Sequence, residues 1–332
     1  MPSVSLALLV RLYCRLVWRR PGLARRALFY VPTWRMLLST ALNEVCYRLR
    51  LRRSFRLTCA VVELSARCNL RCTICARHQV MTRPQGHMAL ETFRSLVDGN
   101  PGIGMYILVG WGEMMLNGAF WEAVEHLRRR GKRIALTTNA TLLDEANVER
   151  LLASGIGHVT VSMDGVDQVY EAIRGIPFAR LEANVRRLSR RIAQTGAPVY
   201  LEINAAATPA VVAQEAEMRR RLGPYVDDIR LSSYVEYNRQ LPTNRTRPCR
   251  ELWRGMITVW YDGTVVPCCM DYNTTMPIGS VGDGPLQDLW NGQASRAFRR
   301  EHTGGRFLRR CATCYEAPPV DGETGIEARF VD

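Results

Sequence analysis

The chain has 332 residues, of which 47% are apolar and 23% are charged. That composition can bury a hydrophobic core, and it excludes a disordered or collagen-like chain. The apolar runs, such as Leu6–Val10, are much shorter than the ~20 residues that cross a bilayer. No cleavable export signal stands at the start, because no basic residue precedes the short apolar stretch. We therefore expect a cytoplasmic protein.

The net charge of +14 is concentrated at the N-terminus. Residues 1–56 hold twelve arginines and one acid, Glu44, so they carry +11. Apolar and aromatic residues alternate with these arginines, which is typical either of helices packed on the protein with a solvated basic face or of a segment that meets an anionic membrane surface or an acidic peptide. The rest of the chain has little basic surplus, so specific nucleic-acid binding is not expected.

Short β-rich runs alternate with longer amphipathic ones between residues 58 and 233. Helices are predicted over Ala119–Arg130, over Asp144–Ala153 with Asp144 as N-cap, and over Leu181–Ala193. Strand, helix, strand with right-handed crossovers predicts a parallel sheet, and six such units can curl into a partial barrel. The predicted strands are Ala60–Leu64, Met105–Val109, Ile134–Thr137, His158–Ser162, Val199–Ile203 and Asp228–Leu231.

After Pro242 the sequence pattern changes to short predicted strands and many glycine, proline and cysteine residues. We therefore predict an α/β protein with a partial (β/α)6 barrel and a small C-terminal cysteine-rich domain. The expected parts are a basic amphipathic arm over 1–56, the barrel over 57–245, the cysteine-rich domain over 246–318 and a tail over 319–332.

Cys68, Cys72 and Cys75 form a CxxxCxxC run directly after the first predicted strand. Three thiolates on one loop can hold three irons of a [4Fe–4S] cluster and leave the fourth iron open to a ligand. The alternative is zinc, with His78 completing a Cys3His tetrahedron. The next three strands also end in polar motifs, and the carboxyl ends of parallel strands meet at one mouth of a barrel. These motifs are Gly110-Trp-Gly-Glu113, Thr137-Thr-Asn139 and Ser162-Met-Asp-Gly165.

A second group of cysteines supplies four thiolates from three separated segments, which closes a cluster without an open iron. A zinc ribbon is the alternative. Cys269 is left over, either as a buried spare thiol or as a hydrogen-atom donor beside a cluster. Asn204, Tyr234 and Glu236 lie near the later strand ends and are candidates for substrate contact. The four predicted ligands are Cys249, Cys268, Cys311 and Cys314.

From these motifs the sequence resembles the radical S-adenosylmethionine (radical SAM) superfamily over residues 58–318. The resemblance implies a cluster on Cys68, Cys72 and Cys75 whose open iron chelates SAM. It also implies that Gly110, Gly112 and Glu113 correspond to the family's GGE motif, Asn139 to TNG, Ser162 and Asp164 to the SxD that meets the SAM ribose, and that Arg174 is a partner for the SAM carboxylate.

The C-terminal cysteines resemble the twitch form of the SPASM auxiliary-cluster domain, which implies a second [4Fe–4S] cluster on Cys249, Cys268, Cys311 and Cys314. There are departures from the family's pattern, since Met114 replaces a proline after GGE and Ala140 replaces the glycine of TNG. Neither removes a ligand.

The resemblance implies an enzyme that receives an electron from a reduced flavodoxin or ferredoxin and cleaves SAM to a 5′-deoxyadenosyl radical. That radical would remove a hydrogen atom from the substrate, and oxidation (dehydrogenation) or epimerisation would follow. The short auxiliary domain favours a small polar substrate such as a sugar, an aminocyclitol or a nucleoside. The alternatives are a maturase of a ribosomally made peptide and, more distantly, a zinc-binding interaction protein, and the catalytic group is open among Cys269, Tyr234 and Glu236.

Overall fold

A computed structural model describes residue 29, residues 33–234, residue 237, residues 245–308, and residues 311 and 314. The predicted tail over 319–332, most of the arm before residue 33 and the candidate Glu236 lie outside the described residues.

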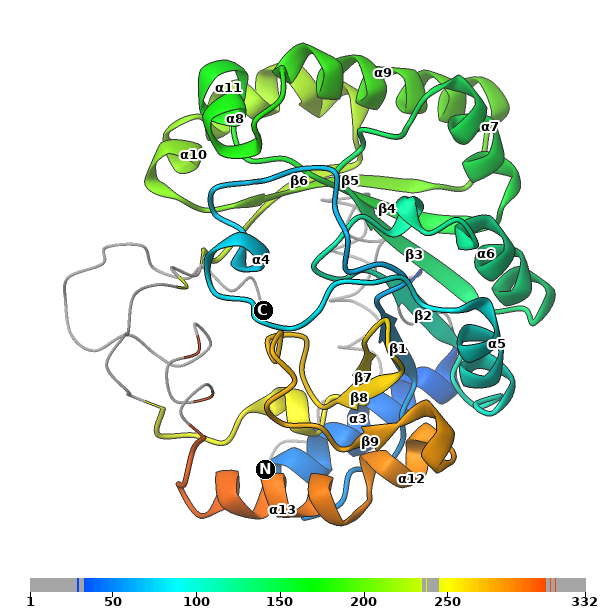
Figure 1. Cartoon of the computed structure of the whole chain (residues 1–332), viewed down its shortest axis with the longest axis vertical. Coiled ribbons are helices and arrows are strands. Elements are labelled where there is room, and N and C mark those ends of the chain that lie inside the picture. Colours follow the sequence, from blue (N-terminus) through cyan, green and yellow to red (C-terminus); the bar gives the residue numbers. More distant parts are fainter. Residues whose placement is uncertain are drawn as a thin grey trace, which may run out of the picture.

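Six parallel strands form the main sheet and pair in chain order, with one register shift, at Ile134 and Ala135 (Figure 1). All six predicted strands are confirmed, and no end differs from the prediction by more than three residues. These strands are β1 (Cys59–Val62), β2 (Met105–Leu108), β3 (Arg133–Thr138), β4 (Ile156–Ser162), β5 (Tyr200–Ala206) and β6 (Asp228–Ser232).

The sheet continues beyond the barrel into the cysteine-rich segment. β7 (Met256–Val259) pairs parallel with β1, and β8 (Thr264–Val266) and β9 (Gly279–Ser280) follow it antiparallel. The described strands therefore make one nine-stranded sheet in which β1 lies between β2 and β7. The chain on either side of residue 246 shares this one sheet.

Helices cover the outer face of the curved sheet, as Figure 1 shows for α6, α7 and α9. Asp144 caps α7 by accepting a hydrogen bond from the Asn147 amide, as its sequence position predicted. Buried apolar residues of α9 recur at helical spacing and pack on the sheet. The helices are α4 (Ala76–Gln79), α5 (Leu90–Asp98), α6 (Phe120–Arg129), α7 (Glu145–Ala153), α8 (Asp167–Arg174), α9 (Phe178–Thr195), α10 (Pro209–Ala213) and α11 (Glu215–Leu222).

Three further helices lie beside the cysteine-rich segment, namely α3 (Trp34–Arg48), α12 (Leu286–Trp290) and α13 (Gln293–Thr303) (Figure 1). Arg299 of α13 is 1% exposed, lies over the Trp290 ring and donates to the Leu252 carbonyl. Because a buried guanidinium needs such acceptors, Arg299 fixes α13 to the loop before β7.

Side chains alternate between the two faces of each strand, so every second residue points into the barrel. At the amino-terminal end this inner face is apolar, where Cys59, Met105 and Ala135 form a small buried cluster with Phe29 and Met256 packed against it. The Phe29 ring also lies edge-on to the His158 ring at 5.6 Å. The inner face is therefore filled at this end, and the polar site lies towards the carboxyl ends of the strands.

Candidate functional site

The CxxxCxxC loop begins where β1 ends and is held in shape by its own backbone and by Arg77. The Leu70 amide lies 3.4 Å from the Cys68 thiol, and the buried Arg77 guanidinium donates to the Leu70 carbonyl at 2.7 Å. Burial raises the pKa of the Cys72 and Cys75 thiols, and the nearby thiols add to the rise. The three sulfurs therefore share one electrostatic environment, in which a cation would favour the thiolate forms.

His78 has its Nε2 atom 2.7 Å from Arg77 and 3.3 Å from the Leu70 carbonyl oxygen. These contacts place the ring on the loop's backbone. In the described part of the chain, no group of three or more His, Cys, Asp or Glu side chains is gathered as ligands of one ion. A single zinc requires all its thiolates at about 2.3 Å from one point, whereas a cluster takes each thiolate on a different iron. The donor set fits a cluster better than one zinc ion.

The glycines after β2 allow two backbone segments to approach closely. A Cβ on Gly110 would lie 2.3 Å from the Glu63 side chain, and one on Gly112 would lie 2.3 Å from the Ser65 carbonyl oxygen. The Glu113 amide then donates to the Arg67 carbonyl at 2.8 Å. The GWGE motif is thus pressed against the start of the cysteine loop.

Glu113 joins that motif to the end of β3. Its carboxylate is buried and accepts from the Thr138 hydroxyl at 2.9 Å and from the Asn139 amide at 2.7 Å. Burial raises the pKa of Glu113, and these hydrogen bonds oppose the rise. The Asn139 side chain continues the chain of contacts, since its amide donates to Asn69 at 2.9 Å and approaches the Cys68 thiol at 3.6 Å. Three predicted motifs therefore meet at one point.

Arg174 lies between the cysteine loop and the motif that follows β4. One terminal nitrogen is 2.6 Å from the Asp164 carboxylate, and the other is 3.8 Å from the Cys72 thiol. Burial opposes its charge, but Asp164 and Cys72 hold the pKa of Arg174 above its ordinary value. Its Nε atom is buried without a hydrogen-bond acceptor among the described residues. Arg174 therefore has a free donor for an anionic group, as expected of a partner for a ligand carboxylate.

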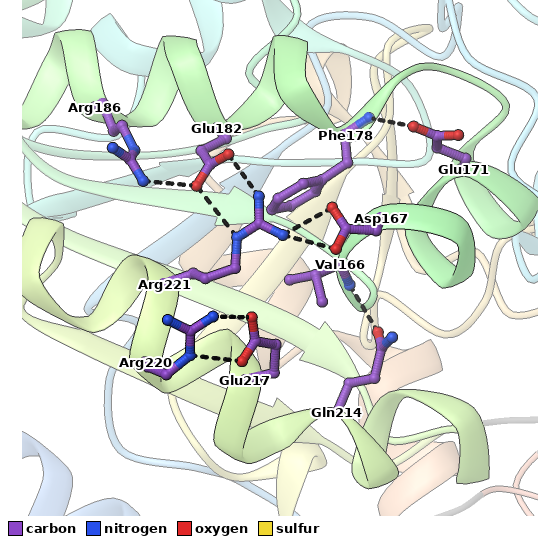
Figure 2. Close-up of polar contacts among 10 residues, drawn as sticks. All are labelled: Val166, Asp167, Glu171, Phe178, Glu182, Arg186, Gln214, Glu217, Arg220 and Arg221. Atoms are coloured by element: carbon purple, nitrogen blue, oxygen red, sulfur yellow. Dashed lines mark hydrogen bonds and ion pairs between the residues drawn. The ribbon is translucent and has the colours of Figure 1, made fainter.

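The loop after β4 is supported from behind by α9 and α11, as Figure 2 shows. Arg221 donates to both Asp167 oxygens at 2.7 and 2.8 Å and to Glu182 at 2.7 Å. Gln214 accepts from the Val166 amide at 2.8 Å. Asp167 has φ 47°, a backbone conformation that L-residues seldom adopt. These contacts hold the start of α8, which carries Arg174 in its last turn.

Polar side chains line the inner face beyond this loop, on the last three parallel strands. Glu202 is 1% exposed and accepts from Thr160 at 3.0 Å and from Arg230 at 3.3 Å. On the next inward position, Ser232 donates to Asn204, which was a predicted substrate contact. Ser162, the other half of the predicted SxD pair, is half-buried at the end of β4 and lies opposite Asn204 in the register.

The four predicted auxiliary ligands come together as expected. Cys249, Cys268, Cys311 and Cys314 line one cavity, together with His302 and apolar residues that include Met276 and Phe298. Burial raises the pKa of Cys311 to about 12, with further increases from Cys268 and Cys314. Burial also lowers the pKa of His302 to about 4, so that its ring is neutral and its Nδ1 accepts from the Cys249 amide.

The spare thiol is placed differently from the expectation, because Cys269 is exposed rather than buried. It lies beside Cys268, and their hydrogen bond is the largest cause of the raised pKa of Cys268. Tyr237 is near both this thiol and Cys75, because its pKa is raised by burial and then by the charges of Cys75, Tyr272 and Cys269. The Tyr237 ring is edge-on to Trp111 at 5.9 Å and to Tyr272 at 5.7 Å. Aromatic side chains therefore separate the two cysteine groups.

Tyr234, another predicted substrate contact, is half-buried and adds its charge to the raised pKa of Tyr237. It therefore lies beside these aromatic rings. Glu236 lies outside the described residues, so its candidacy stays a prediction.

Sequence reasoning missed a buried ion pair of the barrel whose arginine also contacts the cysteine-rich segment. Arg83 and Glu63 are 4% and 0% exposed at their side chains and form two hydrogen bonds of 2.8 and 3.1 Å. Arg83 also donates to the Tyr272 carbonyl and lies over the Trp260 ring at 4.7 Å. Glu63 in turn accepts from the Trp111 amide at 2.9 Å. A lone Arg in a loop gives no sequence signal for such a contact, and the same is true of Gln214 and Arg221.

Comparison with known families assigns two regions of the chain. Residues 62–205 match the model of the radical SAM superfamily, and residues 249–315 match SPASM, an iron–sulfur cluster-binding domain. The chain therefore belongs to the radical SAM superfamily and carries a C-terminal SPASM domain. The two domains imply [4Fe–4S] clusters and SAM as cofactors.

Among curated relatives, an AdoMet-dependent heme synthase of Nitratidesulfovibrio vulgaris is 29% identical over 37% of this chain, and the match spans only 34% of that relative. A PqqA peptide cyclase of Streptomyces rochei is 24% identical over 77% of this chain and 81% of the relative. The second likeness therefore covers most of both chains.

Solved structures show the same fold. Streptococcus suis SuiB bound to the precursor peptide SuiA has a TM-score of 0.61 at 14% identity, covering 77% of this chain and 69% of SuiB. BtrN in complex with AdoMet and 2-DOIA has a TM-score of 0.54 at 18% identity, covering 79% of this chain and 94% of BtrN. At these identities the likeness concerns the fold alone.

Proposed function

We propose that this radical SAM enzyme is a maturase that modifies a peptide. In this proposal Cys68, Cys72 and Cys75 hold the SAM-binding cluster, and Cys249, Cys268, Cys311 and Cys314 hold an auxiliary cluster. The observation that carries the peptide substrate is the likeness to PqqA peptide cyclase over most of both chains.

When bound, the cluster on the first three cysteines would pass an electron from a reduced flavodoxin or ferredoxin to SAM, whose C5′–S bond breaks to give methionine and a 5′-deoxyadenosyl radical. Arg174 would hold the SAM carboxylate through its free Nε donor, since Asp164 already fixes the guanidinium. Glu113 keeps the ends of β2 and β3 together, where the SAM amino group would bind. The remaining predicted SAM contacts are Gly110, Gly112, Asn139 and Ser162.

The peptide would enter the inner face of the barrel from the carboxyl ends of the strands. Arg230 and Glu202 offer a donor and an acceptor there, and Ser232 with Asn204 offers a second such pair one position further along. Groups of this kind can bind successive backbone amides of an extended peptide. The apolar cluster around Phe29 closes the opposite end, which keeps solvent from the radical on that side.

The sequence-based preference for a small polar substrate has weaker support. BtrN, whose structure contains 2-DOIA, shares the fold with this chain at 18% identity. SuiB, with a bound precursor peptide, also shares it, at 14% identity. Fold likeness therefore does not separate the two substrate classes, whereas a relative that matches over most of its length is a peptide cyclase.

SAM binding can be tested apart from the substrate. Anaerobically reconstituted protein with a strong reductant should release 5′-deoxyadenosine. Arg174→Gln should weaken SAM binding by at least about tenfold, because charged hydrogen bonds contribute about 1.5–3 kcal/mol. Arg180→Gln, a neighbouring arginine whose bond is to the Thr141 carbonyl, is the matched control. Equal SAM affinity of the two variants would remove Arg174 from the site.

The substrate class is tested by comparing peptides and metabolites from a strain with and without this protein. We expect one peptide whose mass changes by whole hydrogens or by a new cross-link, and the same change in vitro with purified protein, SAM and reductant. A change confined to a small metabolite, reproduced in vitro, would overturn the peptide proposal while leaving SAM cleavage intact.

A further inference from the structure

α3 has its polar side buried and its apolar side exposed. Ser39 and Asn43 are 4% and 2% exposed, whereas Trp34, Leu37 and Leu49 are 69%, 61% and 65% exposed. At 3.6 residues per turn, the exposed apolar residues fall within about a third of the helix circumference. A surface helix of a globular protein normally shows the reverse arrangement. This outer apolar face consists of Trp34, Leu37, Leu38, Ala41, Val45 and Leu49.

The helix is anchored to the protein by its polar side. Asn43 accepts from the Ser54 hydroxyl at 2.7 Å and donates to the Arg56 carbonyl at 2.8 Å. Tyr47 donates to the Pro248 carbonyl, and Ser54 donates to the Trp253 carbonyl. α3 is therefore docked on the SPASM side of the molecule by hydrogen bonds, and its apolar face is available for another contact.

Positive charge is concentrated in the same segment of the chain. Residues 33–56 contain six arginines, all exposed, and one acid. That acid, Glu44, is 23% exposed at its side chain and is already paired with Arg48 and Arg250, each at 2.8 Å. Residues 1–28 of the sequence contain six more arginines and no acid. Leu51 and Phe55, 44% and 47% exposed, extend the apolar surface among these arginines.

We infer that the outer apolar face of α3 is a docking surface for an anionic membrane, with the helix lying in the plane of the headgroups. Apolar side chains along one face with arginines at its edges are what such interfacial helices present to anionic lipid. Charge complementarity favours this partner over a second copy of the chain, because a second copy would bring an equally basic surface to the contact. No helix among the described residues is long and apolar enough to cross a bilayer.

The experiment uses the full chain and sedimentation with vesicles of phosphatidylcholine, with or without phosphatidylglycerol. The wild type should bind the anionic vesicles at least tenfold more tightly than the neutral ones, and high salt should weaken this preference. Leu37→Glu with Leu49→Glu should reduce binding at least tenfold. Val212→Glu is the control, because Val212 is an exposed apolar residue (39%) on a different helix, α10. This variant should change binding less than twofold.

Contact is measured separately by quenching of tryptophan fluorescence with brominated lipid, where Trp34→Phe should lower the quenching while binding persists. All variants change strongly exposed side chains, and thermal unfolding confirms that each is folded. Binding that the double Glu variant leaves unchanged, or quenching that Trp34→Phe leaves unchanged, would overturn the inference. A wild-type dimer in sedimentation velocity that the double Glu variant dissociates would also overturn it, by assigning the face to a second copy. Binding only to an acidic peptide would do the same.

Discussion

The two groups of cysteines are built in different ways. Cys68, Cys72 and Cys75 lie on one loop that leaves the middle of a parallel sheet, and the strand ends on either side contact it. Cys249, Cys268, Cys311 and Cys314 come from three separated segments and meet only around a shared cavity.

The difference teaches that a site can be positioned either by one short segment of sequence or by contacts between segments far apart in the chain. The first loop is held by short-range bonds to Arg77 and by the motifs after β2 to β4, so its shape follows once the sheet forms. The second site requires residues about 60 positions apart in the chain to meet, and burial raises the pKa of Cys311 to about 12 although Arg245 of the same lining opposes the rise. We therefore expect the first site to persist without its cluster, and the second to depend on it.

The largest effect should separate the two sites directly. Cys75→Ala should abolish reductive SAM cleavage and leave the iron of the second site in place. Cys311→Ala should spare SAM cleavage but stop formation of the modified product. Iron content, electron paramagnetic resonance and 5′-deoxyadenosine release measure these outcomes. SAM cleavage at the parental rate in Cys75→Ala would refute the assignment of the first site, and full product yield from Cys311→Ala lacking the second cluster would refute a catalytic role for that cluster.

The next largest effect should come from the buried ion pair between Arg83 and Glu63, which contributes to the free energy of unfolding. Arg83→Met leaves the Glu63 carboxylate buried without its partner, which should lower the free energy of unfolding by about 3–5 kcal/mol. Arg130→Met removes an ion pair with Asp98 in which both side chains are about half exposed, and it should cost no more than about 1 kcal/mol. Chemical denaturation measures both. Equal losses of unfolding free energy in the two variants would show that the buried ion pair stabilises the protein no more than an exposed one.

Two neighbouring arginines of α11 allow a measurement of how much this helix supports the first site. Arg221→Gln removes the contacts to Asp167 and Glu182 and should lower stability by about 1 kcal/mol and weaken SAM binding a few-fold, because the start of α8 loses its support. Arg220→Gln is the control next to it, since its partner Glu217 does not contact that loop (Figure 2). Identical SAM affinities in the two variants would limit Arg221 to a structural role.

The smallest effect concerns the backbone after β3. Ala140 is buried at φ 60°, a left-handed conformation that costs an L-residue about 1–2 kcal/mol and glycine almost nothing. Ala140→Gly should therefore raise the free energy of unfolding by up to about 1 kcal/mol. The same change at Ala183, an exposed position inside α9, should lower it by about 1 kcal/mol. A loss of stability at both positions would contradict the strain at Ala140.

The sequence predicted the barrel strands well because their apolar runs are short, regular and bounded by turn residues. It also predicted which motifs meet, since the carboxyl ends of consecutive parallel strands must share one edge. The close approach of Gly112 to the residues before the cysteine loop is seen only in the structure, where a Cβ at this position would lie 2.3 Å from the Ser65 carbonyl oxygen.

Other features depend on contacts between distant segments, which periodicity does not report. The pairing of β7 with β1 joins residues about 200 positions apart, so the sequence contained no sign that the two predicted domains share one sheet. Of the two alternatives for Cys269, the buried spare thiol does not match the structure, because a thiol next to a ligand gives no signal of its direction. The sequence did not predict that the apolar face of α3 points outward, because it contained no sign that the polar residues Ser39 and Asn43 are the buried ones.

The pairing of β7 with β1 also limits how the molecule can move. Domains joined by a linker usually shift relative to each other, but here four residue pairs of a parallel ladder run from Cys59 opposite Met256 to Val62 opposite Val259. The barrel and the SPASM domain therefore have no hinge at this junction. The separation between the two cysteine sites should therefore change little while the protein works, because the ladder fixes one region against the other.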